Sequence, residues 1–146
     1  MATKSVVVNA LLPTTATNYV DVTSSGFGTV DAAIIHVSNA NSTNNPQADG
    51  LVAIGFWDGS NQTCVGIITE DGLTSSDTLR VQSSTYGVIL PGSLSNNALE
   101  ASVSSITDGI RITISSSSVT LPRYLSVTLI GGISNSYAGY MALSST

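Results

Sequence analysis

The sequence predicts an all-β fold, a single-domain, jelly-roll-like β-sandwich that spans residues 1–146. β-Branched residues recur in many short runs, and several runs alternate apolar and polar residues with a period of two. No segment keeps a helical period over three turns. Many short strands separated by turns are typical of sandwiches and jelly rolls.

The expected strands differ in how their apolar residues are arranged. In chain order they cover residues 4–12, 18–23, 31–38, 51–57, 63–69, 77–82, 86–91, 98–104, 108–114, 123–131 and 137–143. Residues 125–129 alternate strictly, which predicts one buried face. Residues 51–54 and 88–90 are continuous apolar runs, which predicts strands covered on both faces. A short helical turn is expected near residues 94–99.

The dipeptide Asp-Gly occurs four times, with its glycine at positions 50, 59, 72 and 109. Asp-Gly tolerates the positive φ values of a tight hairpin turn. At Asp58 the polar stretch is longer, which predicts a loop of four or five residues. Trp57 and Cys64 lie near opposite ends of this loop and could pair across the strands. A calcium loop would need more oxygen ligands than Ser60 and Asn61 supply, so we expect a turn and a nearly neutral Asp58→Asn variant.

The composition is poor in charge and rich in neutral polar groups. Only 9% of residues are charged, and serine, threonine and asparagine make up roughly a third. Such a surface can pack against protein without burying ions, although Ser/Thr-rich strands of an ordinary β-domain would look the same. The net charge of −5 and four scattered cations argue against nucleic acid. Glycine and polar residues interrupt residues 124–143, so no membrane contact is expected.

The residue types that carry chemistry are sparse. His36 is the only histidine and Cys64 the only cysteine, and both lie in apolar strand patterns. A zinc site needs more such ligands, and no Gly-x-Ser-x-Gly elbow is present. Glu70 and Glu100 leave a carboxylate pair for glycoside hydrolysis formally open. We therefore expect no enzyme activity, no catalytic residues, no metal site and no cofactor.

Two stretches resemble known proteins. Residues 54–72, IGFWDGSNQTCVGIITEDG, and residues 108–132, DGIRITISSSSVTLPRYLSVTLIGG, resemble virion structural proteins of tailed bacteriophages. The resemblance covers about half of the chain. It implies a small β-sandwich displayed on the particle, often as a trimer, and no catalytic residues. Capsid decoration (cement) proteins are the most similar in size.

The resemblance and the composition lead to one expected function and one alternative. The expected function is a capsid cement subunit that stabilises the phage head shell, is made in the host bacterial cytoplasm, and has the major capsid protein and itself, as a homotrimer, for partners. Candidate shell contacts lie in an N-terminal arm and in the long loop of residues 38–50; they are Met1, Ser5, Val7, Leu12, Asn41, Asn45 and Gln47. The N-terminal arm could equally be a strand of the subunit's own sandwich. The alternative is a receptor-binding tail fibre or spike component that stacks host glycan on exposed aromatic rings. The candidate rings are Trp57 and Tyr86, with Tyr124, Tyr137 and Tyr140.

Overall fold

The computed structural model describes residues 2–40, 50–70, 77–93 and 96–139, and these form a β-sandwich, as expected. The described residues contain no helix. The strands are β1 (Lys4–Leu12), β2 (Tyr19–Thr23), β3 (Ala32–Ser38), β4 (Gly50–Trp57), β5 (Gln62–Glu70), β6 (Asp77–Ser83), β7 (Val88–Ser93), β8 (Asn96–Ile106), β9 (Gly109–Ser117) and β10 (Arg123–Gly131).

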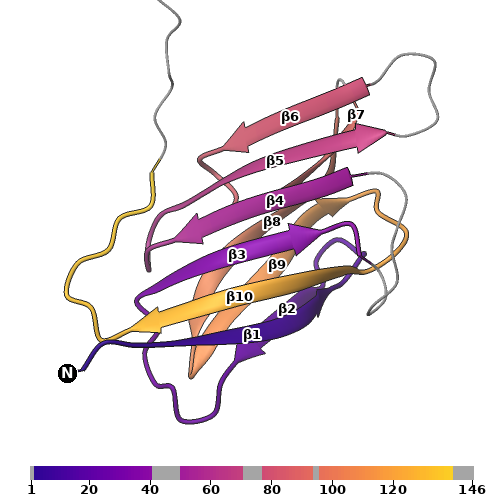
Figure 1. Cartoon of the computed structure of the whole chain (residues 1–146). Helices are drawn as coiled ribbons and strands as arrows, with labels where there is room; N and C mark the ends of the chain where they lie inside the picture. Colours follow the sequence, from indigo (N-terminus) through magenta and orange to yellow (C-terminus); the bar gives the residue numbers. More distant parts are fainter. Residues whose placement is uncertain (1, 41–49, 71–76, 94–95, 140–146) are drawn as a thin grey trace, which may run out of the picture.

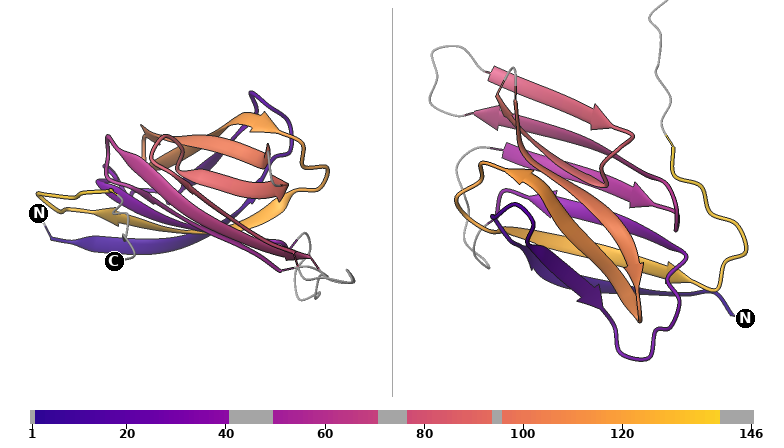
Figure 2. Two further views of the ribbon diagram at one scale, coloured as in Figure 1. Left: turned by 90° about the horizontal axis from the view of Figure 1, so that it is seen from above. Right: turned by 180° about the vertical axis from the view of Figure 1, so that it is seen from behind.

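The strands form two antiparallel sheets that pack face to face (Figures 1 and 2). The larger sheet has six strands in the order β1-β10-β3-β4-β5-β6, and the smaller has four in the order β2-β9-β8-β7. Strands from the two ends of the chain pair with each other, as in a jelly roll: β10 lies between β1 and β3, and β9 lies beside β2. The remaining strands are consecutive hairpins. The sandwich therefore closes only when β10 lies between β1 and β3.

Ten of the eleven expected strands are present. The exception is the last: residues 137–139 form no strand, and residues 140–143 lie outside the described part of the chain. The helical turn expected near residues 94–99 is wrong, because residues 96–99 belong to β8 and pair with β7 and β9. Residues 94–95 are not described.

The core lies between the sheets and is built from the inward positions of each strand. In β10, Leu125, Val127 and Leu129 are buried, as the strict alternation predicts. In β7 the whole apolar run 88–90 is buried, also as expected. The run 51–54 behaves differently: Leu51 and Ala53 are buried, but Val52 keeps 49% of its surface exposed. No described residue covers the outer side of β4, so the expectation of two covered faces is wrong for the single chain.

Both Asp-Gly pairs in the described residues lie at hairpin turns, but the glycine has a different position in each. In the β4–β5 hairpin, Asp58 and Asn61 close a loop in which Gly59 has φ +96°. In the β8–β9 hairpin, Ile106 pairs with Gly109, so the turn residues are Thr107 and Asp108, and Asp108 has positive φ.

The two hairpins also fix the positions of three residues singled out in the sequence. Gly109 is needed because a Cβ there would meet the backbone of Val22 on β2. Trp57 pairs with Gln62 and Cys64 with Gly55, so Trp57 and Cys64 are not a direct cross-strand pair. Asp49 and the Asp71-Gly72 pair lie outside the described residues.

Candidate interaction surface

The outer face, defined here as the side of the six-stranded sheet that points away from the four-stranded sheet, carries an apolar patch. Figure 1 looks directly onto this face. The apolar patch consists of six side chains on three neighbouring strands: Ile34, Val52, Ile54, Phe56, Val65 and Ile67. The strand register makes three direct pairs of them, Ile34 with Phe56, Ile54 with Val65, and Val52 with Ile67. Directly paired residues share a face, so the patch is continuous.

The patch is open to solvent in the single chain. Val65 is 50% exposed, Val52 49%, Ile67 41% and Phe56 40%. A groove of about 480 Å³ runs along β4, β5 and β6, between the patch and the side chains of Arg80 and Gln82. Soluble monomers seldom leave a continuous apolar surface of this kind uncovered, and larger ones usually mark interaction sites.

In the middle of β4 and β5, over residues 53–56 and 64–67, the small side chains point inward and the large apolar ones outward. The inward positions of these two segments hold Ala53, Gly55, Cys64 and Gly66, while the outward positions hold most of the apolar patch. Leu51 and Trp57, at the two ends of β4, are large and point inward. The small residues admit the close approach of the second sheet. A Cβ at Gly55 would meet the backbone oxygen of Gly87, and one at Gly66 would lie 3.0 Å from that of Ile89. Leu51 and Trp57 of β4 are thus the large core side chains of these two strands, Ile68 of β5 packs partly against the core, and the other bulky apolar residues lie on the outer face.

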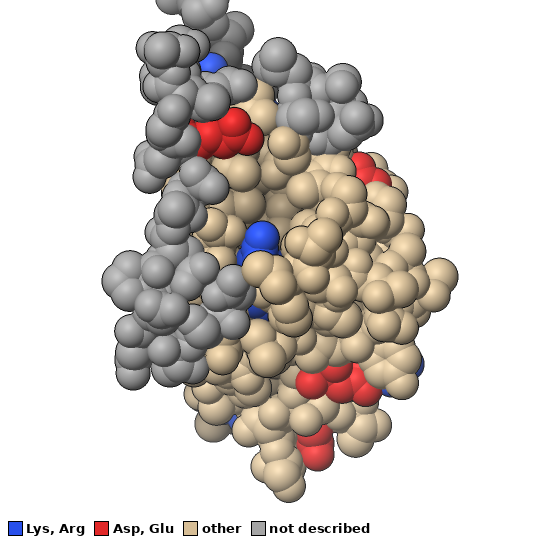
Figure 3. All heavy atoms as spheres, turned by 90° about the vertical axis from the view of Figure 1, so that its right-hand side faces the viewer, with Lys and Arg blue, Asp and Glu red and all other residues tan. Residues whose placement is uncertain are grey.

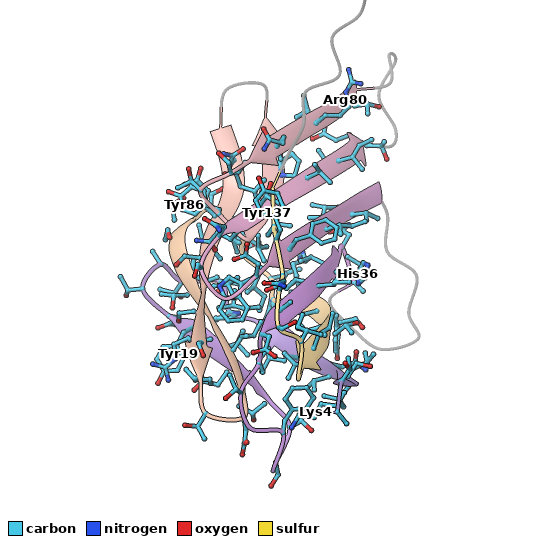
Figure 4. The ribbon with its side chains drawn as sticks, turned by 90° about the vertical axis from the view of Figure 1, so that its left-hand side faces the viewer. Lys4, Tyr19, His36, Arg80, Tyr86 and Tyr137 are labelled. Atoms are coloured by element: carbon cyan, nitrogen blue, oxygen red, sulfur yellow. The ribbon has the colours of Figure 1, made fainter. Side chains whose placement is uncertain are left out.

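Charge is nearly absent from the outer face. The acids in the described side chains lie elsewhere, in turns, at the sheet end or on the other sheet: Asp21, Asp31, Asp58, Glu70, Glu100 and Asp108. The polar residues of β1 and β10 on this face are neutral, as at Asn9 and Thr128. Figure 4 shows His36 and Arg80 pointing outward from this sheet. In Figure 3, which views the sandwich from one end, charged atoms form small separate islands on a neutral surface.

The candidate shell contacts differ in their exposure to solvent. Ser5 and Val7 lie exposed on the outer side of β1, and Val7 is 61% exposed. Leu12 is 1% exposed, so its proposed contact is wrong: it belongs to the core. Residues 4–12 pair with β10, which confirms the strand alternative and not a free arm. Met1, Asn41, Asn45 and Gln47 lie outside the described residues.

The residues proposed for glycan stacking do not form a platform. Trp57 is 3% exposed, because it takes an inward position of β4, so its stacking role is wrong. Tyr86 is half-buried and lies on the far side of the molecule from His36 (Figure 4). Of the other candidate rings, Tyr137 is 86% exposed, Tyr124 is half-buried, and Tyr140 lies outside the described residues. Tyr19, whose ring centre lies 3.8 Å from the Arg111 guanidinium, is 53% exposed, and Phe56 is 40% exposed.

The groups considered for catalysis do not converge. His36 is on the outer face, and Cys64 is buried at its inner side. Burial raises the pKa of the Cys64 thiol to about 11, against the opposing hydrogen bonds from the backbone of Ser83 and Ile89. Glu70 and Glu100 lie on different sheets. Within the described ranges no three His, Cys, Asp or Glu residues are grouped to hold a metal, and no helix there could cross a membrane.

Asp31 and Asp58 hold the segment that follows β10 against one end of the sandwich. The backbone N–H of Ile133 donates to the Asp31 carboxylate at 3.0 Å, and that of Ala138 donates to Asp58 Oδ2 at 2.8 Å. The Ser136 hydroxyl donates to the backbone oxygens of both acids. A polar pocket of about 320 Å³ lies beside them. Both carboxylates already accept hydrogen bonds from the protein backbone. We therefore assign these two residues a structural role, in which they attach the segment after β10 to the sandwich.

Comparisons with known proteins add no relative. No protein-family model, curated protein or solved structure compared with this chain matches it. The sequence does contain a signal for the apolar patch. If the small residues of β4 and β5 are assigned to the inner side of the sheet, the period of two places the apolar residues between them on the outer face.

Proposed function

We propose that this chain is a structural virion protein, a decoration (cement) subunit that binds the head shell of a tailed bacteriophage and stabilises it. The observation that carries the proposal is the neutral, partly apolar outer face. A surface with so few charges can be buried against protein without desolvating ions, which would be costly. Its hydroxyl and amide groups can form neutral hydrogen bonds, each contributing about 1 kcal/mol net.

The proposed contact with the major capsid protein is the free edge of β1. This strand pairs only with β10 among the described strands, so its other edge is open. Ser5 and Val7 are exposed, and Lys4 is the only charged residue in the strand. An open edge of this length is a template for strand addition by a neighbouring chain. Many copies on one shell would sum weak contacts, and binding only to the intact shell stabilises it by mass action.

Heat release of the genome tests this function. Particles stripped of the protein should release genome at a lower temperature than complete particles, and adding back purified protein should restore the difference. Val7→Lys puts a charge on the β1 edge and should restore less, because lysine at an edge opposes strand pairing. Ser115→Lys adds the same charge at an exposed position of the four-stranded sheet and should restore fully. Deleting residues 1–12 is unsuitable, because it removes β1 from the sheet.

The same particles separate the cement function from receptor binding. A cement subunit is present in many copies per particle, whereas a tail tip is present in few. Stripped particles that keep their heat resistance but fail to adsorb to host cells would contradict the cement function and favour the fibre or spike alternative.

A further inference from the structure

We propose that the outer face is a self-association surface, on which two copies of this chain pack their six-stranded sheets face to face about a two-fold axis. The inference deepens the proposed function and rests on it, since it names the partner that covers the face of the same structural subunit. It replaces the expected trimer with a dimer for this contact. Four observations on the described residues support it.

The first observation is that β4 has the pattern of a strand covered on both sides. Its residues 51–54 are all apolar, whereas an antiparallel strand with one solvated face alternates apolar and polar residues. In β10, which β3 separates from β4, polar residues do alternate with apolar ones, with Ser126 and Thr128 outward. On β1 the outward apolar residues Val7 and Leu11 are separated by Asn9, whereas every outward position of residues 52–56 in β4 is apolar. A second layer over this part of β4 would give the strand the environment that its sequence specifies.

The second observation is the inverted size of the side chains in the middle of β4 and β5, over residues 53–56 and 64–67. Inside, Gly55 and Gly66 let the second sheet approach at backbone distance. Outside, Phe56 and Ile67 project into solvent. In a sandwich that ends at this sheet, the larger residues would face the core. Their outward position is explained when the outer face is itself an inner layer of the assembly.

The third observation is the area of the face. Strands lie about 4.8 Å apart and rise about 3.3 Å per residue, so six strands of seven residues cover roughly 670 Å². Two such faces would bury roughly 1,300 Å² together, which is within the range of about 1,200–2,000 Å² for specific interfaces. The apolar patch alone would fall below this range. The whole face has an apolar centre, and its flanks hold neutral polar residues together with Arg80, Val7 and Leu11.

The fourth observation is the charge on the face, which favours a second copy over a differently charged partner. None of the described acids lies on the face, and Arg80 is its only described side chain with a permanent charge. A two-fold axis that runs across the strands through the centre of the patch packs patch on patch. Arg80 lies one row from the central pair Ile54 and Val65. The two copies of Arg80 would then be about 14 Å apart along the strands, beyond the screening length of about 8–10 Å.

The mass of the purified full chain in solution tests the inference. Light scattering on a sizing column and sedimentation velocity, from about 1 to 100 µM, should give twice the 14.9 kDa of one chain. Val65→Lys places a charge at the centre of the patch and should weaken dimerisation at least about 100-fold. Ser115→Lys, with the same charge on the other sheet, should remain dimeric. Circular dichroism should show that both variants keep a sheet spectrum.

Each other outcome overturns the inference. A monomer at 100 µM, a trimer, or a Val65→Lys variant that dimerises normally would each do so. If Val65→Lys does not fold, the double variant Val65→Thr and Ile67→Thr, which keeps β-branched residues, should still lose the dimer. A monomeric protein that restores heat resistance to stripped particles would leave the proposed function intact and remove only the dimer. A dimer that does not restore heat resistance to stripped particles would contradict the proposed function and leave the dimer intact.

Discussion

At the scale of single residues, two turn aspartates each join distant parts of the chain. Asp58 Oδ1 accepts the N–H groups of Ser60 at 2.9 Å and Asn61 at 2.6 Å, while its other oxygen accepts Ala138 N–H. Asp108 accepts the N–H groups of Gly26 and Gly28 in the loop between β2 and β3. The Asp58 carboxylate thus stabilises its own hairpin and also binds a remote segment, and the Asp108 carboxylate binds a remote loop. Both aspartates lie at turns, where the sequence predicted only local roles.

Replacing Asp58 tests whether its second oxygen matters. The turn alone would tolerate asparagine, which was the expectation from the sequence. In the structure, an asparagine amide would keep one acceptor for the turn and place its NH₂ group against the Ala138 N–H donor. We therefore expect Asp58→Asn to lower the free energy of unfolding by about 1–2 kcal/mol in urea titrations. Ser60→Ala keeps the backbone donor and should stay within about 0.5 kcal/mol. An equally small change in Asp58→Asn would show that the Ala138 contact contributes nothing.

The same aspartates predict a loss of stability in acid. Burial opposes ionisation of Asp58, but hydrogen bonds from Asn61, Ala138 and Ser60 together hold its pKa well below the ordinary 3.8. Hydrogen bonds from Gly28 and Gly26 lower the pKa of Asp108 in the same direction. A lowered pKa in the folded state gives stability that is present above the ordinary pKa and is lost as pH falls through the folded value.

The urea midpoint should therefore be flat from about pH 7 to pH 5 and fall steadily below about pH 4. Asp58→Asn should make the fall shallower, because one titrating group is removed. A midpoint that does not change between pH 5 and pH 2.5 would contradict the roles given to both carboxylates.

At the scale of the elements, β4 and β5 show what glycine does in this sheet. Gly55 and Gly66 have ordinary strand conformations, so it is space and not backbone freedom that requires them. The backbone near β7 approaches both positions. This approach draws the two sheets together at one side, and in the middle of β4 and β5 the bulky residues Ile54, Phe56, Val65 and Ile67 lie on the outer face.

Alanine at these two glycines should have graded effects. A methyl group at Gly55 meets the backbone oxygen of Gly87, which cannot move without shifting the strand. At Gly66 the nearest atoms are 3.0 Å and 3.1 Å away, so a small adjustment suffices. We expect Gly55→Ala to cost more than about 2 kcal/mol and Gly66→Ala about 1 kcal/mol, measured by urea unfolding. Equal costs would mean that β7 does not hold its position against β4.

The strands could be predicted from the sequence because their signal is local. Period-two alternation located β9 and β10, and the apolar run 88–90 located β7. Partner choice is not local: nothing near Lys4 indicates that β1 will pair with β10, more than a hundred residues later. Trp57 was misplaced for a related reason. It borders a polar turn and so looked exposed, but its parity with Leu51 and Ala53 puts it inside.

At the scale of the whole molecule, acids and apolar surface are segregated. The chain carries a net charge of −5, yet its described acidic side chains are all off the outer face. Two approaching copies would repel each other through this net charge at long range. At contact, the proposed interface contains no described ion pair. Repulsion and attraction therefore come from different parts of the surface and respond differently to salt.

Raising the salt concentration should strengthen the proposed dimer. Salt screens the repulsion between two chains of like charge, because the screening length falls from about 10 Å at 0.1 M to about 3 Å at 1 M. The favourable free energy from burying Val52, Phe56 and Val65 is not electrostatic, so screening does not reduce it. Sedimentation at 50 mM and 500 mM NaCl should therefore show a lower dissociation constant at the higher concentration, and sodium sulfate should lower it further, because excluded salts favour apolar burial. An interface held by ion pairs would weaken instead, and a dissociation constant that rises with salt would place the contact away from the outer face.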